Sequence, residues 1–159
     1  MKINIYTDGA AKGNPGPGGY GVVLMAGKHY KELSAGYRLT TNNRMELLAV
    51  IVGLEALKKH HQEVTVYSDS KYVVDAVEKG WVFNWEKKNF KAKKNQDLWK
   101  RFLKSFRVPQ VHFKWIKGHA GHPQNEICAQ LAVAEAESLQ LSVDVDYESA
   151  SKMQSALPT

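Results

Sequence analysis

The order of extended and helical segments constrains the fold of this chain more than any other feature of its sequence. Three segments of β-type residues come first, and helical segments then alternate with two further short apolar strands. The expected strands cover residues 2–8, 20–25, 30–39, 64–68 and 111–116. Antiparallel strands followed by α/β alternation predict a mixed sheet that is covered by helices, and so an α/β fold.

Apolar residues at helical spacing predict the helices. The expected helices cover residues 40–59, 70–78, 95–105 and 123–138. After Gln140 the sequence is polar and has neither helical nor strand periodicity. We therefore expect one folded domain over residues 1–140 and a flexible tail over residues 141–159.

The connection between the first two strands is rich in glycine. Residues 9–19 hold five glycines together with Pro15 and Pro17, which predicts tight turns. The stretch of residues 13–21 lacks the Gly-Lys-Ser/Thr ending of a nucleotide-binding loop, and it leads into a strand instead of a helix. We interpret it as a loop that lets the backbone approach a bulky ligand, with a plain Gly/Pro turn as the alternative.

Composition narrows the class of protein. The 159 residues are 43% hydrophobic and 24% charged, as in a single globular domain. Cys128 is the only cysteine, so no intramolecular disulfide can form and a cytoplasmic location is expected. No apolar run approaches the ~18 residues of a membrane span, and the first residues lack the apolar core of a signal peptide. These features exclude secreted mini-proteins, membrane proteins, fibres and two-domain enzymes.

Three acidic residues lie at predicted strand ends or at a predicted helix start. Asp8 and Asp69 follow apolar strand residues, and Glu46 lies in the expected first turn of the long helix. If the two strands are parallel neighbours, both carboxylates emerge at one edge of the sheet, toward which a packed helix can aim Glu46. Clustered carboxylates repel one another, and a hard divalent cation such as Mg²⁺ or Mn²⁺ relieves the repulsion. The pattern therefore predicts a metal site.

Each of these acids also has a purely structural interpretation. Asp8 precedes a glycine, as in a common turn dipeptide. Glu46 stands three residues after Asn43, which is the spacing of a capping box. Asp69 or Ser70 could cap the helix that follows. Spacing alone leaves both interpretations open.

Positive charge is concentrated in one segment. The formal net charge of the chain is +6, whereas residues 86–107 alone carry nine Lys+Arg and two acids, or +7. Aromatic residues are interleaved with these lysines: Trp81, Trp85, Phe90 and Trp99. Lysines with aromatic neighbours fit contact with a nucleic-acid backbone, and a solvated helix face is the alternative.

A loop before the last predicted helix holds two histidines, His119 and His122. With a single cysteine in the chain, a structural zinc site is not expected. A loop histidine near an acidic cluster suits proton transfer, and a solvated histidine without a catalytic role is the alternative.

Six motifs, taken together, resemble the type 1 ribonuclease H family in its prokaryotic, single-domain form. In chain order they are YTDG (6–9), GNPGPGGYG (13–21), TTNNRMELLA (40–49), SDSKYV (68–73), KNQDLW (94–99) and KGHAGHPQNE (117–126). The resemblance spans about residues 1–137 and implies the ribonuclease H-like fold, a five-stranded mixed sheet flanked by α-helices. It also implies an endonuclease that uses two Mg²⁺ ions, with Mn²⁺ as a substitute, to cut the RNA strand of RNA/DNA hybrids. The products would carry 5′-phosphate and 3′-hydroxyl ends.

The same resemblance assigns roles to individual residues. Asp8, Glu46 and Asp69 would hold the metal ions, and His119 would assist proton transfer or product release. The residues that would bind the hybrid are Asn14, Thr41, Asn42, Asn43, Lys71, Trp81, Trp85, Lys87, Lys88 and Asn95. The asparagines before position 44 would contact the minor groove and RNA 2′-hydroxyls. Thr41 and Asn95 would hold a DNA-strand phosphate, and the tryptophans and lysines of 81–94 would grip the DNA strand.

One position departs from the family pattern. After the segment NEIC (125–128) the family has a fourth catalytic acid, an aspartate, and this chain has Ala129. Alanine has no oxygen with which to coordinate a metal, so we expect the chain to bind hybrid well and to cleave it poorly. The substitution fits an engineered trap of an intact enzyme, and a naturally weakened enzyme is the alternative.

Two other classes of function remain as alternatives. One is a hybrid- or duplex-binding module without useful catalysis, which Ala129 and the basic segment favour. The other is an integrase- or transposase-like enzyme of the same fold that acts on DNA, against which the asparagine-rich motifs argue. In each case we expect a monomer that binds nucleic acid and no membrane.

Overall fold

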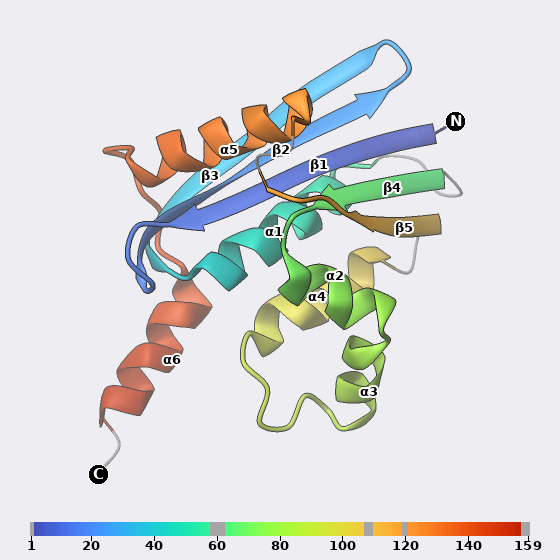
Figure 1. Ribbon diagram of the computed structural model, residues 1–159. Coiled ribbons are helices and arrows are strands. Elements are labelled where there is room, and N and C mark those ends of the chain that lie inside the picture. Colours follow the sequence, from blue (N-terminus) through green and yellow to red (C-terminus); the bar gives the residue numbers. More distant parts are fainter. Residues whose placement is uncertain (1, 58–62, 107–109, 119–120, 157–159) are drawn as a thin grey trace.

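The chain folds into five strands and, within the residues that the structure describes, six helices (Figure 1). This computed structural model describes residues 2–57, 63–106, 110–118 and 121–156. The strands are β1 (Lys2–Ala11), β2 (Gly16–Ala26), β3 (His29–Thr40), β4 (Glu63–Ser68) and β5 (Gln110–Trp115). The helices are α1 (Asn42–Glu55), α2 (Lys71–Glu78), α3 (Trp81–Lys87), α4 (Gln96–Phe106), α5 (Pro123–Ala136) and α6 (Val145–Ala156). None of these helices is long and apolar enough to cross a membrane.

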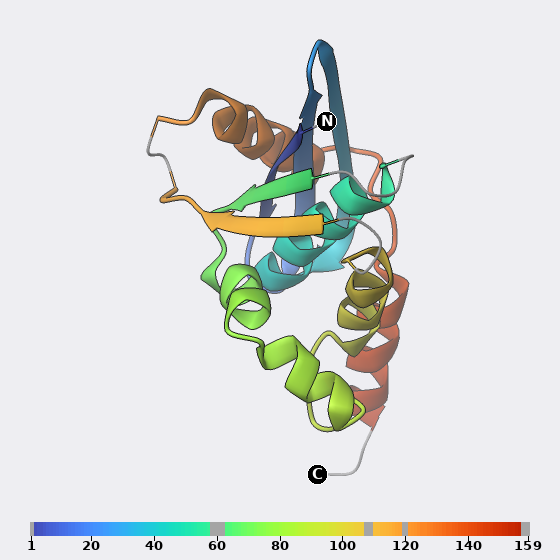
Figure 2. The ribbon, with the colours of Figure 1, turned by 90° about the vertical axis from the view of Figure 1, so that its right-hand side faces the viewer.

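The strands form one mixed sheet in the order β3-β2-β1-β4-β5. β2 runs antiparallel to both β1 and β3, whereas β4 runs parallel to both β1 and β5. Helices cover both faces, with α5 on one side and α1, α2 and α4 on the other (Figure 2). The predicted α/β fold with a five-stranded mixed sheet is confirmed.

The hydrophobic core lies between the sheet and α1. Alternate residues of β1 and β4 point into it, so Ile3, Ile5, Val64 and Val66 are all buried. α1 is buried on most of its surface because the sheet covers one side of it while α2 and α4 pack against it elsewhere. This packing fixes the direction of α1 and sets its N-terminal end beside the end of β1.

Helix α5 packs closely on the opposite face, over β1, β2 and β3. A Cβ atom on Gly21 would lie 2.3 Å from the carbonyl oxygen of Cys128, and one on Gly19 would lie 2.5 Å from that of Ala132. Side chains at these positions would therefore push the helix off the sheet. At these two glycines the interpretation as a backbone approach to a ligand is wrong, since the backbone approaches α5.

The turn between β1 and β2 is shorter than the predicted 9–19. β1 continues to Ala11, which pairs with Gly18 in the antiparallel ladder. The N–H of Lys12 donates to the carbonyl oxygen of Pro17 at 2.7 Å and closes the turn. Pairing across the ladder thus extends both strands into a segment whose glycines and prolines predict only turns.

The sequence patterns do not predict α3 or α6, and a tail without regular structure is wrong for residues 145–156. The docking of α6 depends on charge instead of apolar periodicity. Glu148 accepts two hydrogen bonds of 2.9 Å from Arg38, and Asp144, just before the helix, binds Arg44. The N–H of Ser142 donates to a β3 carbonyl at 3.0 Å, and so joins the segment to the sheet edge.

Candidate active site and nucleic-acid interface

Three carboxylates meet where the central strands β1 and β4 part. The parallel pairing of these strands ends at Tyr6 and Tyr67, so Asp8 and Asp69 both lie just beyond it. Glu46 reaches the same place from α1, past the first turn of that helix. One carboxylate oxygen from each of the three acids lies within 4.8 Å of the others. The structure therefore brings together the three acids that the sequence singles out.

Other side chains cap the neighbouring helices. The Thr41 hydroxyl accepts a hydrogen bond from the N–H of Arg44 at 3.2 Å and caps α1. The Ser70 hydroxyl accepts from the N–H of Val73 at 3.3 Å and caps α2. Because hydroxyl groups provide these caps, the carboxylates of Glu46 and Asp69 are available for the cluster.

Glycine allows the elements that carry the acids to approach one another. A Cβ atom on Gly9 would lie 2.4 Å from the backbone nitrogen of Glu46, so the end of β1 touches the α1 backbone. On the other side, a Cβ atom on Gly118 would lie 3.1 Å from a carboxylate oxygen of Asp69. These close approaches bring the three acids to one point.

The cluster is electrostatically strained and suits a divalent cation. Burial raises the pKa of Glu46 well above its ordinary value, and the charges of Asp8 and Asp69 raise it further. The Oε2 atom of Glu46 is buried and has no hydrogen-bond partner among the described residues. Converging carboxylate oxygens are the ligands that Mg²⁺ and Mn²⁺ prefer. The residues therefore fit the metal that the sequence predicts.

The three acids line a cavity of about 490 Å³, which we call the carboxylate cavity. Its wall also includes Asn42, Asn43, Lys71 and Ala129. Ala129 thus faces the acids from α5, as the motif predicts for this position. The position of His119 lies outside the described residues.

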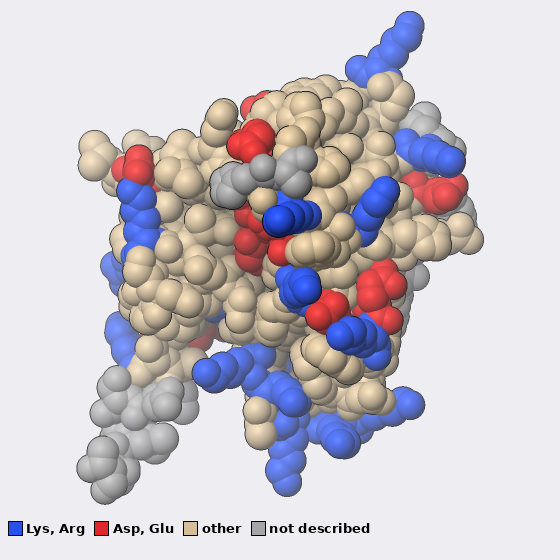
Figure 3. Space-filling view, viewed as in Figure 1, with Lys and Arg blue, Asp and Glu red and all other residues tan. Residues whose placement is uncertain are grey.

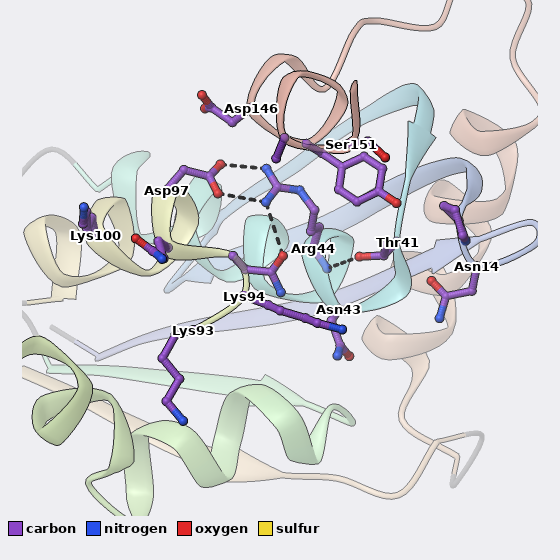
Figure 4. Close-up of a pocket in the computed structure, with 15 residues that line it drawn as sticks. Asn14, Thr41, Asn43, Arg44, Lys93, Lys94, Asp97, Lys100, Asp146 and Ser151 are labelled. Carbon is purple, nitrogen blue, oxygen red and sulfur yellow. Dashed lines mark hydrogen bonds and ion pairs between the residues drawn. The ribbon is translucent and has the colours of Figure 1, made fainter. Parts of the chain in front are cut away.

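A larger groove of about 800 Å³ adjoins this cavity (Figure 4). Asn43 lines both spaces. The groove, which we call the asparagine groove, also holds the predicted binding residues Asn14, Thr41 and Asn95. Lys93, Lys94 and Lys100 lie along it and make it attractive to an anion.

Asparagine side chains tie the loop before β2 to the start of α1. The N–H of Asn42 donates to Oδ1 of Asn14 at 3.1 Å. In turn, Oδ1 of Asn42 accepts from the N–H of Ala11 at 2.6 Å. These bonds place the polar side chains of two motifs at one surface.

Arg44 organises the wall of the groove (Figure 4), although none of the sequence patterns above predicts a role for it. It is 3% exposed, and its guanidinium donates two hydrogen bonds each to Asp97 and Asp144, at 2.7–2.9 Å. It also donates to Oδ1 of Asn95 at 3.3 Å, and the Asn95 amide donates to the Tyr72 hydroxyl at 3.1 Å. Although burial alone would lower it, the hydrogen bonds to the two aspartates raise the pKa of Arg44. The sequence signal for this role is a charged residue within a buried helix.

The tryptophans and lysines that are predicted to bind the DNA strand begin at α3. A small pocket of about 180 Å³, which we call the tryptophan pocket, is lined by Trp81, Asn84, Trp85, Lys88, Lys91 and Lys93. The ammonium of Lys93 lies 5.1 Å from the centre of the Trp85 ring, and that of Lys79 lies 5.2 Å from the Trp81 ring. Lys87 lies in the last turn of α3 and does not line the pocket.

The charges of this face are segregated (Figure 3). Lysine and arginine side chains gather at the lower end of the view, over α3 and the segment that follows it, while acidic atoms lie near the centre. Residues 86–107 carry nine of the 22 Lys+Arg of the sequence. Both predicted features, an acidic site and a basic surface, are thus present on one molecule.

Fold and site together define an α/β protein with a carboxylate cluster, suited to a divalent cation, at the end of two parallel central strands. The RNase H family model matches residues 1–137. The chain belongs to the RNase H family, and the family predicted from the six motifs is confirmed. Members of this family generally use divalent metal ions, in agreement with the cluster of Asp8, Glu46 and Asp69.

Curated proteins named ribonuclease H are similar to this chain over most of their length. The chain is 57% identical over 149 residues to "Ribonuclease H" of Desulforamulus reducens, covering 91% of this chain and 93% of the relative. It is 51% identical over 152 residues to "Ribonuclease HI" of Pasteurella multocida, covering 92% and 97%. The similarity therefore extends over more than nine tenths of each protein.

Solved structures agree with the fold. LC9-RNase H1, described as a type 1 RNase H with the type 2 active-site motif, is 30% identical with a TM-score of 0.78, covering 99% of this chain and 85% of that one. LC11-RNase H1, solved in complex with an RNA/DNA hybrid, is 30% identical with a TM-score of 0.62, covering 85% and 96%.

Proposed function

We propose that this protein is an endonuclease that hydrolyses the RNA strand of RNA/DNA hybrids. The observation that carries the proposal is the convergence of Asp8, Glu46 and Asp69 in a cavity that shares Asn43 with a groove lined by asparagines and lysines. Two Mg²⁺ ions, replaceable by Mn²⁺, would activate water and stabilise the leaving 3′ oxygen, which yields 5′-phosphate and 3′-hydroxyl ends. The three carboxylates would hold these ions, and His119 would move a proton.

The chain's own residues would select the hybrid by shape. Asn14, Asn42 and Asn43 lie at one surface, where their amide groups can pair with 2′-hydroxyls in the minor groove. Thr41 and Asn95 lie in the asparagine groove, where they would hold a phosphate of the DNA strand. Since none of these contacts reads a base edge in the major groove, we expect little sequence preference.

The basic surface would bind the DNA strand farther from the cut. Trp81, Trp85 and Lys88 line the tryptophan pocket, and Lys87 lies beside it on α3. Their positive charge and ring faces suit a phosphate backbone. Retention on hybrid should therefore weaken steeply with salt, and a competition assay between hybrid and DNA duplex tests the preference for hybrid.

Ala129 would limit cleavage. It lines the carboxylate cavity from α5 and offers no ligand oxygen. We predict that Ala129→Asp increases Mg²⁺-dependent cleavage of a labelled hybrid by about 100-fold or more, since even indirect metal partners are worth 10–100-fold. Affinity for hybrid should change far less than the rate.

Val133→Asp provides a matched control for this experiment. Val133 lies one turn farther along α5 and lines the same cavity, but it is 44% exposed. A carboxylate there adds the same charge without occupying the motif position, so no comparable gain is expected. Equal cleavage by Ala129→Asp and the unaltered chain would contradict the proposed role of position 129.

A second candidate function is a hybrid- or duplex-binding module, favoured by Ala129 in the cavity wall and by the basic surface. A metal titration separates the two. An enzyme forms product in Mg²⁺ or Mn²⁺, whereas a pure binding module shows only salt-sensitive retention of the hybrid. We further propose that the protein is cytoplasmic and monomeric. Light scattering of the purified chain with and without hybrid would test the monomeric state.

A further inference from the structure

Trp115 lies at the junction between the sheet and the carboxylate cavity. It is the last residue of β5 and pairs with Ser68, the residue before Asp69. Its indole N–H donates to the main-chain carbonyl of Asp69 at 3.1 Å. The ammonium of Lys71 lies 4.9 Å from the centre of its ring, within the range of a cation–π contact. One side chain thus contacts two residues of the cavity wall.

Both of these partners belong to the wall of the carboxylate cavity, and Trp115 does not. Asp69 and Lys71 line the carboxylate cavity, whereas Trp115 is not among its lining residues and is 43% exposed beside it. A tryptophan so exposed adds little to the core. Its two contacts are therefore better explained by their effect on Asp69 and Lys71 than by general stability.

We propose that Trp115 is a positioning residue that holds Lys71 as a phosphate-binding group for the RNA strand and orients the main chain of Asp69. The inference rests on the proposed function, because it assumes that RNA enters the carboxylate cavity. A lysine ammonium on a flexible four-carbon stem loses conformational entropy when it binds a phosphate. The Trp115 ring reduces that loss, since it restricts the ammonium to the cavity wall before the nucleic acid arrives.

The location of Lys71 favours a phosphate ligand. The ammonium is a point charge that suits a phosphate oxygen. Three carboxylates share the cavity with it, so a phosphate that enters here meets both the metal-binding acids and one fixed positive charge. In this position Lys71 would neutralise a phosphate next to the one that is cut.

The dependence of hybrid binding on salt tests the first contact. Affinity is measured by fluorescence anisotropy with a labelled RNA/DNA hybrid in Ca²⁺ at several KCl concentrations. Lys71→Gln should reduce the magnitude of the slope of log affinity against log salt by about 0.9, the value for one phosphate contact. Trp115→Leu should reproduce most of this loss, and the double variant should lose no more than Lys71→Gln alone. Trp115→Phe keeps a ring face and should keep most of the slope.

A matched control removes one charge elsewhere. Lys28 is exposed in the turn between β2 and β3, far along the sheet from the cavity, and Lys28→Gln should leave the slope unchanged. Effects of Lys71→Gln and Trp115→Leu that add fully in the double variant, or a slope unchanged in both, would overturn the inference. If the unaltered chain itself fails to bind hybrid, the proposed function fails first, and the inference fails with it.

The second contact has a separate readout. Trp115→Phe lacks the indole N–H that Asp69 accepts, so in an Ala129→Asp background it should raise the Mg²⁺ concentration for half-maximal cleavage by about tenfold. The Lys28→Gln variant in the same background should not shift it. If cleavage requires the same Mg²⁺ concentration with and without Trp115→Phe, the indole N–H does not influence the metal site, and this part of the inference is overturned.

Discussion

At the scale of single residues, hydroxyl groups cap the two helices and leave the nearby acids available to the carboxylate cluster. An aspartate or glutamate near a helix start usually satisfies backbone N–H groups. Here Thr41 and Ser70 fulfil that role for α1 and α2, so Glu46 and Asp69 do not have to. The cost appears at Glu46, because its burial, and then the charges of Asp8 and Asp69, raise its pKa. Such a strained cluster is stable only where the surrounding packing holds it or where a cation neutralises it.

The ion pair of Asp97 with Arg44 predicts a dependence of stability on pH. Although burial alone would raise it, the hydrogen bonds and charge of Arg44 lower the pKa of Asp97 in the folded state. Stability from this group is therefore present above its unfolded-state pKa, about 3.9, and is lost as pH falls through the folded-state value. We predict that Asp97→Asn lowers the free energy of unfolding by about 2 kcal/mol at pH 7 and by much less at pH 3.

Urea unfolding at both pH values measures this difference. Glu63→Gln is the control, because Glu63 is an exposed acid at the start of β4 and forms none of the ion pairs described for Arg44. The prediction is wrong if the difference between the unaltered chain and Asp97→Asn is the same at pH 7 and at pH 3.

The three acids could be predicted from sequence, whereas Arg44 could not. Asp8 and Asp69 follow strands whose apolar alternation is clear, so the edge at which they emerge follows from the topology. Arg44 is marked only as a charged residue in a mainly apolar helix, which does not identify its partners, because Asp97 and Asp144 are 53 and 100 residues away. Its role depends on a tertiary arrangement that periodicity does not encode.

At the scale of elements, the contact of α5 with the sheet sets the position of residue 129. Glycines on β2 let the helix backbone lie directly on the strand. The same helix carries Ala129 to the carboxylate cavity. The glycines of this motif, whose sequence suggests ligand binding, therefore influence the site by letting α5 pack against the sheet.

We predict that Gly21→Ala destabilises the protein by about 1–3 kcal/mol. The added Cβ would lie 2.3 Å from the carbonyl oxygen of Cys128, so the helix or the strand must shift. The control is Gly27→Asn, at a hairpin position with φ +61° and no atom within 4 Å of the added Cβ. Asparagine tolerates this backbone region, so a change of only a few tenths of a kcal/mol is expected there. Thermal unfolding of both variants distinguishes the outcomes, and equal melting temperatures would contradict the prediction.

The elements that sequence patterns miss share a physical cause. α3 is a short helix after Gly80, and its sequence combines exposed and half-buried aromatics without a clear apolar stripe. α6 forms an ion pair with β3, and Asp144 just before it forms one with α1; ion pairs leave no apolar period along the chain. Buried segments such as α1 and β4 are predictable because burial itself imposes their apolar pattern.

At the scale of the whole molecule, residues 142–151 belong to the folded structure that shapes the asparagine groove. Asp146, Tyr147 and Ser151 of α6 line that groove opposite the lysines that follow α3 (Figure 4). The segment is joined to the sheet at Ser142 and to α1 at Asp144. A domain that ends at residue 140 would therefore leave Arg44 with one of its two aspartates and the buried Thr40 hydroxyl without its acceptor.

This arrangement predicts the effect of removing residues 141–159. Breaking a buried ion pair by deleting one partner costs about 3–5 kcal/mol, and Arg44 keeps Asp97, so we expect a loss near 3 kcal/mol, or roughly 10 °C in melting temperature. Asp144→Ala in the full chain should reproduce most of this loss, because Asp144 accepts from both Arg44 and Thr40. Asp146→Asn, a substitution of an exposed acid on α6, is the control and should change little. Calorimetry measures the melting temperature of each variant. A truncated chain as stable as the full chain would mean that residues 141–159 are a dispensable tail. Lower stability of both the truncated chain and Asp144→Ala would instead show that the C-terminal segment stabilises the fold through Arg44.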